Sequence, residues 1–180
     1  GVDPTDDLPR TMMTYNKITL RTAAPLILIV VSQILFLPSF QFGHIPGDSS
    51  KFNVVWLAEF AEQLFNGHIY PRWLPGLNAG YGGPDFYFYG PLPFFIGAPF
   101  TLIATEKMAV VLLRWTLCLI SGFAMYAFAM TQMSRDRALF AGIVYMAAPY
   151  HLILAIMTRN VIGEQAALAL LPLELYYDAR

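Results

Sequence analysis

Charged residues and cysteine are scarce in this chain. Of its 180 residues 13% are charged, whereas a soluble domain carries about 25%. No charge lies between Ala23 and Gly43, and Arg114 is the only one between Met108 and Ser134. The single cysteine, Cys118, excludes a disulfide framework and a cysteine-based metal site. The net charge of −1 gives no reason to expect nucleic acid as a partner.

Apolar residues are abundant instead, at 57% of the chain, and the mean hydropathy is +0.51. This composition is typical of an integral membrane protein. Residues 23–40 form an uncharged stretch of about 18 residues, enough for a helix that crosses roughly 27 Å. We interpret it as a first transmembrane helix and signal anchor. The polar leader 1–22 carries Lys17 and Arg21 close to this helix, which predicts a cytoplasmic N-terminus.

The segment 41–91 is long, aromatic and rich in Gly and Pro, and we predict that it is a first outer loop. Within it, Lys51–Asn66 has an amphipathic pattern, with charged residues on one face and Trp56 and Phe60 on the other. We expect an interfacial helix that Ser49 or Ser50 caps and Gly67 ends. Ten glycines and prolines between residues 68 and 93 exclude a second long helix in the loop.

Four apolar segments follow the loop, and residues 92–180 are predicted to form further membrane helices: Leu92–Ala104, Met108–Met130, Ala138–Met157 and Ala166–Tyr177. If all crossed the membrane, Arg135 and Arg137 would lie outside, against the positive-inside tendency. If the short, proline-broken segment 92–104 does not cross, these arginines become cytoplasmic and the turn 158–164 returns to the side of the first loop. We favour this second arrangement. The chain is expected to be one transmembrane domain, the N-terminal fragment of a longer all-α, polytopic protein.

Two acidic residues are candidates for chemistry. Asp48 follows the first helix, where a carboxylate can bind a metal ion or accept a proton from a hydroxyl. A helix cap or a solvated loop acid is an equally open interpretation. Glu164 opens the last apolar segment and either complements the helix dipole or meets Asp48 as a second acid. Arg159 beside it is a phosphate-binding candidate or an interfacial anchor.

The remaining polar candidates are weaker. Arg72 lies among aromatic residues and prolines, where it can grip a diphosphate or make a cation–π contact with Trp73 or Tyr70. His44 and His68 are possible ligands or proton carriers, although no metal-binding spacing accompanies them. A further carboxylate is Asp85.

Two polar residues fall inside apolar segments. Arg114 and His151 are expected to face the protein interior or an aqueous cavity, with Arg114 alternatively snorkelling to the interface. The chain has no nucleotide-binding loop, because Gly80–Pro84 lacks the Lys-Ser/Thr that follows in such loops. It also has no serine hydrolase elbow.

Several motifs together resemble a bacterial group of multi-spanning membrane proteins labelled "6-pyruvoyl-tetrahydropterin synthase-related", and through it the GT-C glycosyltransferase superfamily. The motifs are NGHIYPRWLP at residues 66–75, GYG at 80–82, FYGPL at 88–92, and Arg159 to Glu164 followed by Leu-Pro-Leu at 171–173. The likeness runs from about Ala23 to the end of the chain. It departs from many GT-C enzymes at Ser49, where these carry a second acid.

The resemblance implies transfer of a sugar from a polyprenyl-phosphate donor on the outer face of a bacterial cytoplasmic membrane. Asp48 matches the first-loop aspartate that acts as catalytic base or ligand of a divalent cation (Mg²⁺ or Mn²⁺), and Glu164 matches the acid of the second outer loop. The implied substrate-binding residues are Arg72, Arg159, His44, His68, Trp73 and Tyr81. The alternative is a non-enzymatic lipid-binding or transport subunit, or a degenerate relative without the chemistry.

Overall fold

The computed structural model describes residues 10–43, 47–151 and 159–179, with side chains from residue 23 onward. These residues are all-α, as predicted, and their only extended pairing is an isolated bridge between Leu74 and Gly83. The helices in chain order are α1 (Arg10–Phe42), α2 (Ser50–Phe65), η1 (Asn78–Gly80), α3 (Asp85–Phe88), α4 (Leu92–Gly97), η2 (Ala98–Leu102), α5 (Glu106–Ala129), α6 (Arg135–Ala147) and α7 (Ile162–Asp178).

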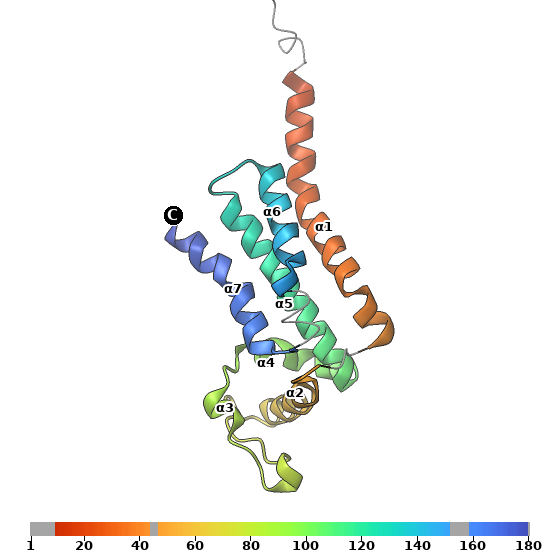
Figure 1. Ribbon diagram of the computed structural model, residues 1–180, viewed down its shortest axis with the longest axis vertical. Helices are drawn as coiled ribbons and strands as arrows, with labels where there is room; N and C mark the ends of the chain where they lie inside the picture. Colours follow the sequence, from red (N-terminus) through yellow and green to blue (C-terminus); the bar gives the residue numbers. More distant parts are fainter. Residues whose placement is uncertain (1–9, 44–46, 152–158, 180) are drawn as a thin grey trace, which may run out of the picture.

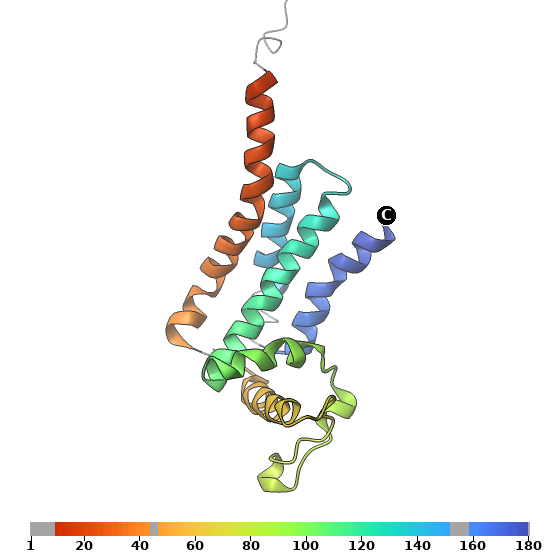
Figure 2. The same ribbon diagram turned by 180° about the vertical axis from the view of Figure 1, so that it is seen from behind.

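Four helices form an elongated bundle, and the segment between α1 and α5 forms a cap at one of its ends (Figure 1). The central helix α5 packs against α1, α6 and α7. It runs away from the cap, α6 returns toward it, and α7 runs away again (Figure 2). The turn before α7 therefore lies at the cap end, and the α5–α6 connection lies at the opposite end.

Helix α1 is longer than the predicted segment, because it begins at Arg10 rather than at residue 23. Leu28, Ser32 and Phe36 lie four residues apart and are buried, because this spacing places them on one helix face. Trp115 of α5 donates a hydrogen bond from Nε1 to Ser32 Oγ at 3.1 Å. In the described residues, Ala23–Phe42 and Glu106–Ala129 are the two helices long and apolar enough to cross a membrane.

Helix α2 confirms the amphipathic helix predicted in the first loop. Its apolar face, with Trp56 and Phe60, is buried in a cluster that includes Phe86 and Phe94 from the rest of the cap. The Phe60 and Phe86 rings meet edge to face at 4.8 Å between centroids, a favourable geometry for aromatic pairs. Gly67 follows the helix with φ +97°, a conformation that glycine adopts without strain.

Segment 92–104 does not run the length of the bundle. It folds into α4 and η2, which pack on α2 and α5 at the cap end (Figure 1). This agrees with the arrangement favoured from the sequence, in which segment 92–104 does not cross and the first loop and the turn before α7 lie at the same end of the bundle.

The helix predicted over Ala138–Met157 is not continuous in the described residues. Helix α6 covers Arg135–Ala147, Ala148 is not helical, and residues 149–151 are helical again, whereas residues 152–157 of the prediction lie outside the described residues. Helix α6 ends at Ala147, and Ala148 is extended, with ψ 132°. The reason is Pro149, whose ring disfavours helical backbone in the residue before it.

Candidate functional site

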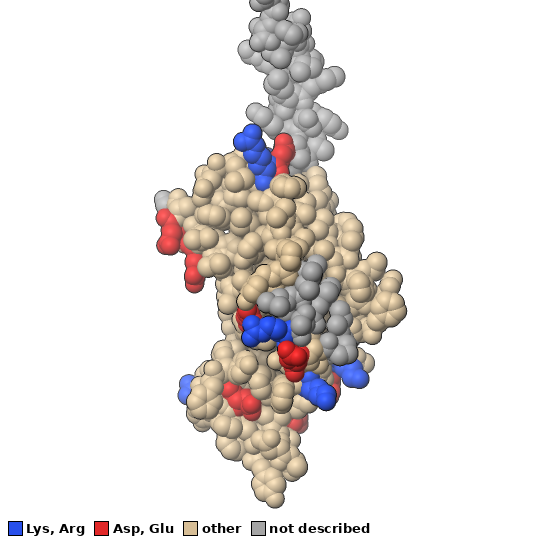
Figure 3. Space-filling view, viewed as in Figure 1, with Lys and Arg blue, Asp and Glu red and all other residues tan. Residues whose placement is uncertain are grey.

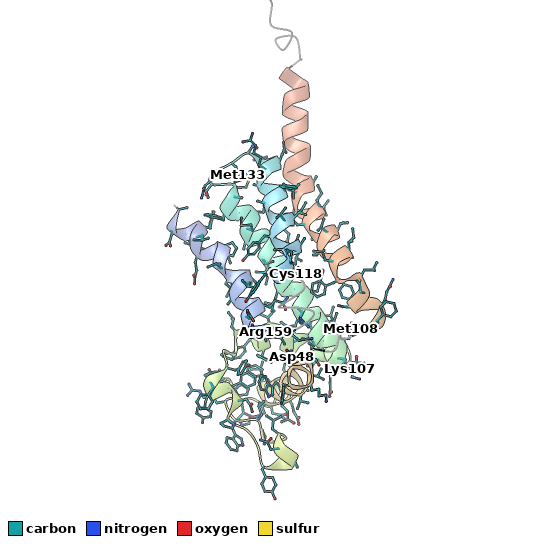
Figure 4. The ribbon with its side chains drawn as sticks, viewed as in Figure 1. Asp48, Lys107, Met108, Cys118, Met133 and Arg159 are labelled. Atoms are coloured by element: carbon teal, nitrogen blue, oxygen red, sulfur yellow. The ribbon has the colours of Figure 1, made fainter. Side chains whose placement is uncertain are left out.

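Two turns meet where the cap joins the bundle. The turn that carries Asp48 leads into α2, and residues 159–161 lead into α7. The Ser49 amide donates a hydrogen bond to the Arg159 carbonyl at 3.2 Å, and Asn53 Nδ2 donates to the Asn160 carbonyl at 2.5 Å. Figure 4 labels Asp48 and Arg159 near each other at this junction. Segments more than 100 residues apart in sequence are thus joined.

The side chains of Tyr150, Arg159 and Glu164 interact with one another at the surface of this junction. Together with Asp48 of the adjoining turn we call them the junction cluster. Arg159 Nη1 lies 3.2 Å from Glu164 Oε2, with side-chain exposures of 50% and 25%. The Tyr150 hydroxyl donates a hydrogen bond to Glu164 Oε1. This bond, together with the negative charge of the carboxylate, raises the pKa of Tyr150. Glu164 also lies in the first turn of α7, where its charge complements the helix dipole.

Below this cluster lies a buried polar network of four residues, Asn53, Arg114, Asn160 and Gln165. Arg114 is only 3% exposed, so the snorkelling interpretation is wrong and the expectation of an interior position is confirmed. Its guanidinium donates to Asn160 Oδ1 and to Gln165 Oε1, the latter at 3.3 Å. Gln165 Nε2 donates back to the Arg114 carbonyl at 2.8 Å, and Asn53 Nδ2 lies 3.1 Å from Asn160 Oδ1.

The network holds the backbone that presents Arg159. Asn160 has φ +59°, in the left-handed region that asparagine tolerates better than most residues. Its side chain accepts from both Arg114 and Asn53, and its carbonyl also accepts from Asn53. Arg114 and Asn53 therefore position the junction cluster without belonging to it.

Arg72 lies in the cap, in a different group of residues. Its guanidinium stacks over Tyr70 at 4.6 Å and faces Tyr87 at 5.7 Å. The cation–π interpretation is confirmed for Tyr70. The hollow that Arg72 lines is also lined by His68 and Trp73.

The sequence-predicted residues thus separate into two places. Asp48, Arg159 and Glu164 lie at the junction, whereas His68, Arg72 and Trp73 line a hollow of the cap that none of those three lines. Tyr81 follows η1, is 87% exposed and lines neither place. His44 lies outside the described residues.

The two open interpretations of Asp48 are narrowed by its position. Asp48 is exposed, and the N-cap position of α2 belongs to Ser49, so Asp48 is not the cap residue. Among the described residues no three His, Cys, Asp or Glu side chains gather as a possible metal site. Binding of Mg²⁺ or Mn²⁺ at Asp48 stays a prediction. Asp85, the weaker carboxylate, lies in the first turn of α3.

His151 faces the interior, as expected. It is 3% exposed, and its ring meets Tyr145 edge to face at 5.6 Å. Neither ring nitrogen has a hydrogen-bond partner among the residues that the structure describes.

Sequence reasoning missed Tyr150, Asn53, Asn160 and Gln165. The signal for Gln165 and Arg114 was present, since each is a polar residue in or beside an apolar segment and such residues pair with each other. Their partners in the loop carried no such signal. No known protein family, curated protein or solved structure matches this chain.

Proposed function

We propose that the chain is a polytopic membrane protein of GT-C type that transfers a sugar from a polyprenyl-phosphate donor. Its site is the junction cluster, on the outer face of a bacterial cytoplasmic membrane, with the N-terminus inside. The observation that carries the proposal is the backbone pairing of two distant turns, Ser49 to Arg159, which brings the turn of the exposed Asp48 next to the turn of Arg159. A carboxylate and a cation together suit a phosphate-linked donor and a hydroxyl acceptor.

The membrane part of the proposal is supported by the distribution of charge. Two helices, Ala23–Phe42 and Glu106–Ala129, are long and apolar enough to cross a bilayer. On the face drawn in Figure 3, charged atoms gather at the far end of the bundle, near the end of α7 and around the cap, with an uncharged stretch between them. A lipid donor would keep its tail beside this stretch and its phosphate at the junction.

Each side chain of the cluster has a role in the proposed reaction. Arg159 binds the donor phosphate, because a guanidinium has five N–H donors and its contact with Glu164 leaves others available. Glu164 and Tyr150 orient the guanidinium. Asp48 accepts the proton of the acceptor hydroxyl group while the oxygen of that hydroxyl attacks the sugar C1 atom. The bond from C1 to the phosphate oxygen breaks, the polyprenyl phosphate leaves with the bonding electrons, and the configuration at C1 inverts.

The test is sugar transfer by the protein in proteoliposomes, supplied with a panel of polyprenyl-phosphate sugars. Asp48→Asn should lower the transfer rate at least about 100-fold, the usual contribution of a general base. The matched control is Asp85→Asn, which alters a carboxylate of the cap and should retain the wild-type rate. Wild-type activity in Asp48→Asn would remove the catalytic assignment.

The second candidate is a non-enzymatic lipid-binding or transport subunit. It is favoured by the engagement of Glu164 with Arg159 and Tyr150, which leaves Asp48 as the one carboxylate of the cluster outside these contacts. In this case the protein would bind the polyprenyl phosphate without turnover, and Asp48→Asn would bind it as well as the wild type.

A further inference from the structure

An open groove runs along the outer side of α2, away from the residues of the junction cluster. It consists of two adjoining hollows of about 360 and 470 Å³ that share Gln63, His68 and Pro75 as lining residues. We call these two hollows the outer groove. Their volumes fall in the range of small-molecule sites, about 300–1,000 Å³.

The first feature of the outer groove is a fixed aromatic surface. Trp73 is 49% exposed, and its indole lies directly against Gly82, where an added Cβ would be 2.3 Å from Nε1. Gln63 Nε2 donates to the Trp73 carbonyl at 2.7 Å. The next residue, Leu74, exchanges two backbone hydrogen bonds of 2.9 Å with Gly83. The Trp73 indole is therefore fixed by its contact with Gly82 and by the backbone bonds of Trp73 and Leu74, and its exposed part lines the groove.

A second flat surface lies beside the first. Tyr70, Arg72 and Tyr87 line the same hollow as Trp73, and the guanidinium stacks on the Tyr70 ring. A stacked guanidinium stays planar and keeps its edge donors available for hydrogen bonds.

Planar polar groups of α2 line the other hollow. Glu59 Oε2 accepts a hydrogen bond from the Gly76 amide at 3.0 Å, which fixes the loop against the helix. Glu62 is exposed one residue before Gln63, and Asn66 follows at the end of the helix. Carboxylates accept hydrogen bonds in pairs, whereas amides both donate and accept.

We propose that the outer groove binds an uncharged saccharide chain. A sugar ring has a C–H face that packs on an aromatic ring and a rim of hydroxyl groups that pair with planar polar side chains. The groove offers both within one continuous surface. Its lining carries two carboxylates, Glu59 and Glu62, against the single guanidinium of Arg72, which disfavours phosphate-rich or other polyanionic chains. The inference goes beyond the proposed transfer reaction and does not depend on it.

The experiment measures binding of oligosaccharides of two to four units, made of glucose, mannose, galactose or N-acetylglucosamine, to the protein in phospholipid nanodiscs. Titration calorimetry and saturation-transfer NMR should detect at least one of these sugars. Trp73→Ala should weaken binding at least about tenfold, which corresponds to the loss of roughly 1.4 kcal/mol of stacking. Tyr81→Ala removes an exposed aromatic ring outside the groove and should bind like the wild type.

A second variant tests the groove independently in case Trp73→Ala does not fold. Glu62→Gln changes one exposed side chain and should weaken binding several-fold, because the amide keeps one acceptor oxygen but loses the charge that strengthens its hydrogen bond. Asp48→Asn should bind the saccharide like the wild type even where it fails to transfer sugar, so the two proposals fail separately. The inference is overturned if no oligosaccharide binds, if Trp73→Ala and Glu62→Gln bind like the wild type, or if a polyanion such as heparin binds instead.

Discussion

The buried polar network and the outer groove both consist of polar side chains around α2, but the two differ in what satisfies those side chains. Asn53, Arg114, Asn160 and Gln165 are each at most 3% exposed and bond to one another. In the outer groove, Glu59 and Gln63 bond to loop backbone, whereas Glu62 and Arg72 are exposed. Burial makes the first set part of the fold, because an unpaired polar group there costs free energy. Exposure leaves the second set available to a ligand.

The largest effect is expected from Arg114→Met. Removing the guanidinium leaves Gln165 Oε1 buried without its donor and Asn160 Oδ1 without one of its donors, which should lower the free energy of unfolding by roughly 3 kcal/mol. Thermal unfolding of the protein in detergent measures the change. The matched control is Lys107→Met, an exposed cation in the first turn of the same helix, which should change stability by less than about 0.5 kcal/mol. Equal stability of the two variants would show that the network does not hold the junction.

An intermediate effect is expected from Gly82→Ala, compared with Gly80→Ala. Both glycines have positive φ, +79° and +92°, so each variant should lose about 1–2 kcal/mol. Only at Gly82 does the added methyl group meet Trp73. Gly82→Ala should therefore also shift the tryptophan fluorescence and weaken oligosaccharide binding, whereas Gly80→Ala should do neither. Identical fluorescence and binding in the two variants would contradict a fixed indole surface.

The smallest effect on stability is expected in the junction cluster, at Tyr150 and Glu164. Because Glu164 raises the pKa of Tyr150, Glu164→Gln should lower that pKa and let the phenol ionise at a lower pH. In an ultraviolet absorbance titration, the signal of Tyr150 is the difference between a protein that has this tyrosine and the same protein with Tyr150→Phe. This subtraction isolates one of the ten tyrosines. Stability should stay within about 0.5 kcal/mol in both variants. An unchanged Tyr150 titration in Glu164→Gln would contradict an effect of the Glu164 carboxylate on the pKa of the Tyr150 phenol.

Local pattern predicted some of the helices well and failed where a single residue interrupted an apolar segment. The spacing of Trp56 and Phe60 predicted α2 and its buried face, because amphipathic periodicity is a property of neighbouring residues. Hydropathy placed a 20-residue helix over 138–157, since it does not register the backbone restriction that Pro149 imposes on Ala148. Hydropathy also did not predict that α1 begins at Arg10, because residues 10–22 form helix without being an apolar segment.

The candidate site was predictable in its charged members and not in its supporting ones. Asp48, Arg159 and Glu164 stood out as charges beside apolar segments, and their turns lie at one end in the topology predicted from the positive-inside tendency. Asn53 lies in the predicted amphipathic helix and Asn160 in a turn, and neither residue type is unusual at such a position in the sequence. Their role arises from a contact between positions 107 residues apart, and single-sequence patterns contain no information about such a pairing.

The sequence by itself determined the two long apolar helices, Ala23–Phe42 and Glu106–Ala129, the amphipathic helix of the first loop and the short, broken segment before α5. Hydropathy, periodicity and proline act over a few neighbouring residues. Only the tertiary structure decided which polar residues pair. It buried Arg114 rather than letting it snorkel, and it separated Arg72 and Trp73 from Asp48. The reason is physical: a buried guanidinium must find oxygen acceptors, and in this chain the fold brings them from a distant turn and from α7.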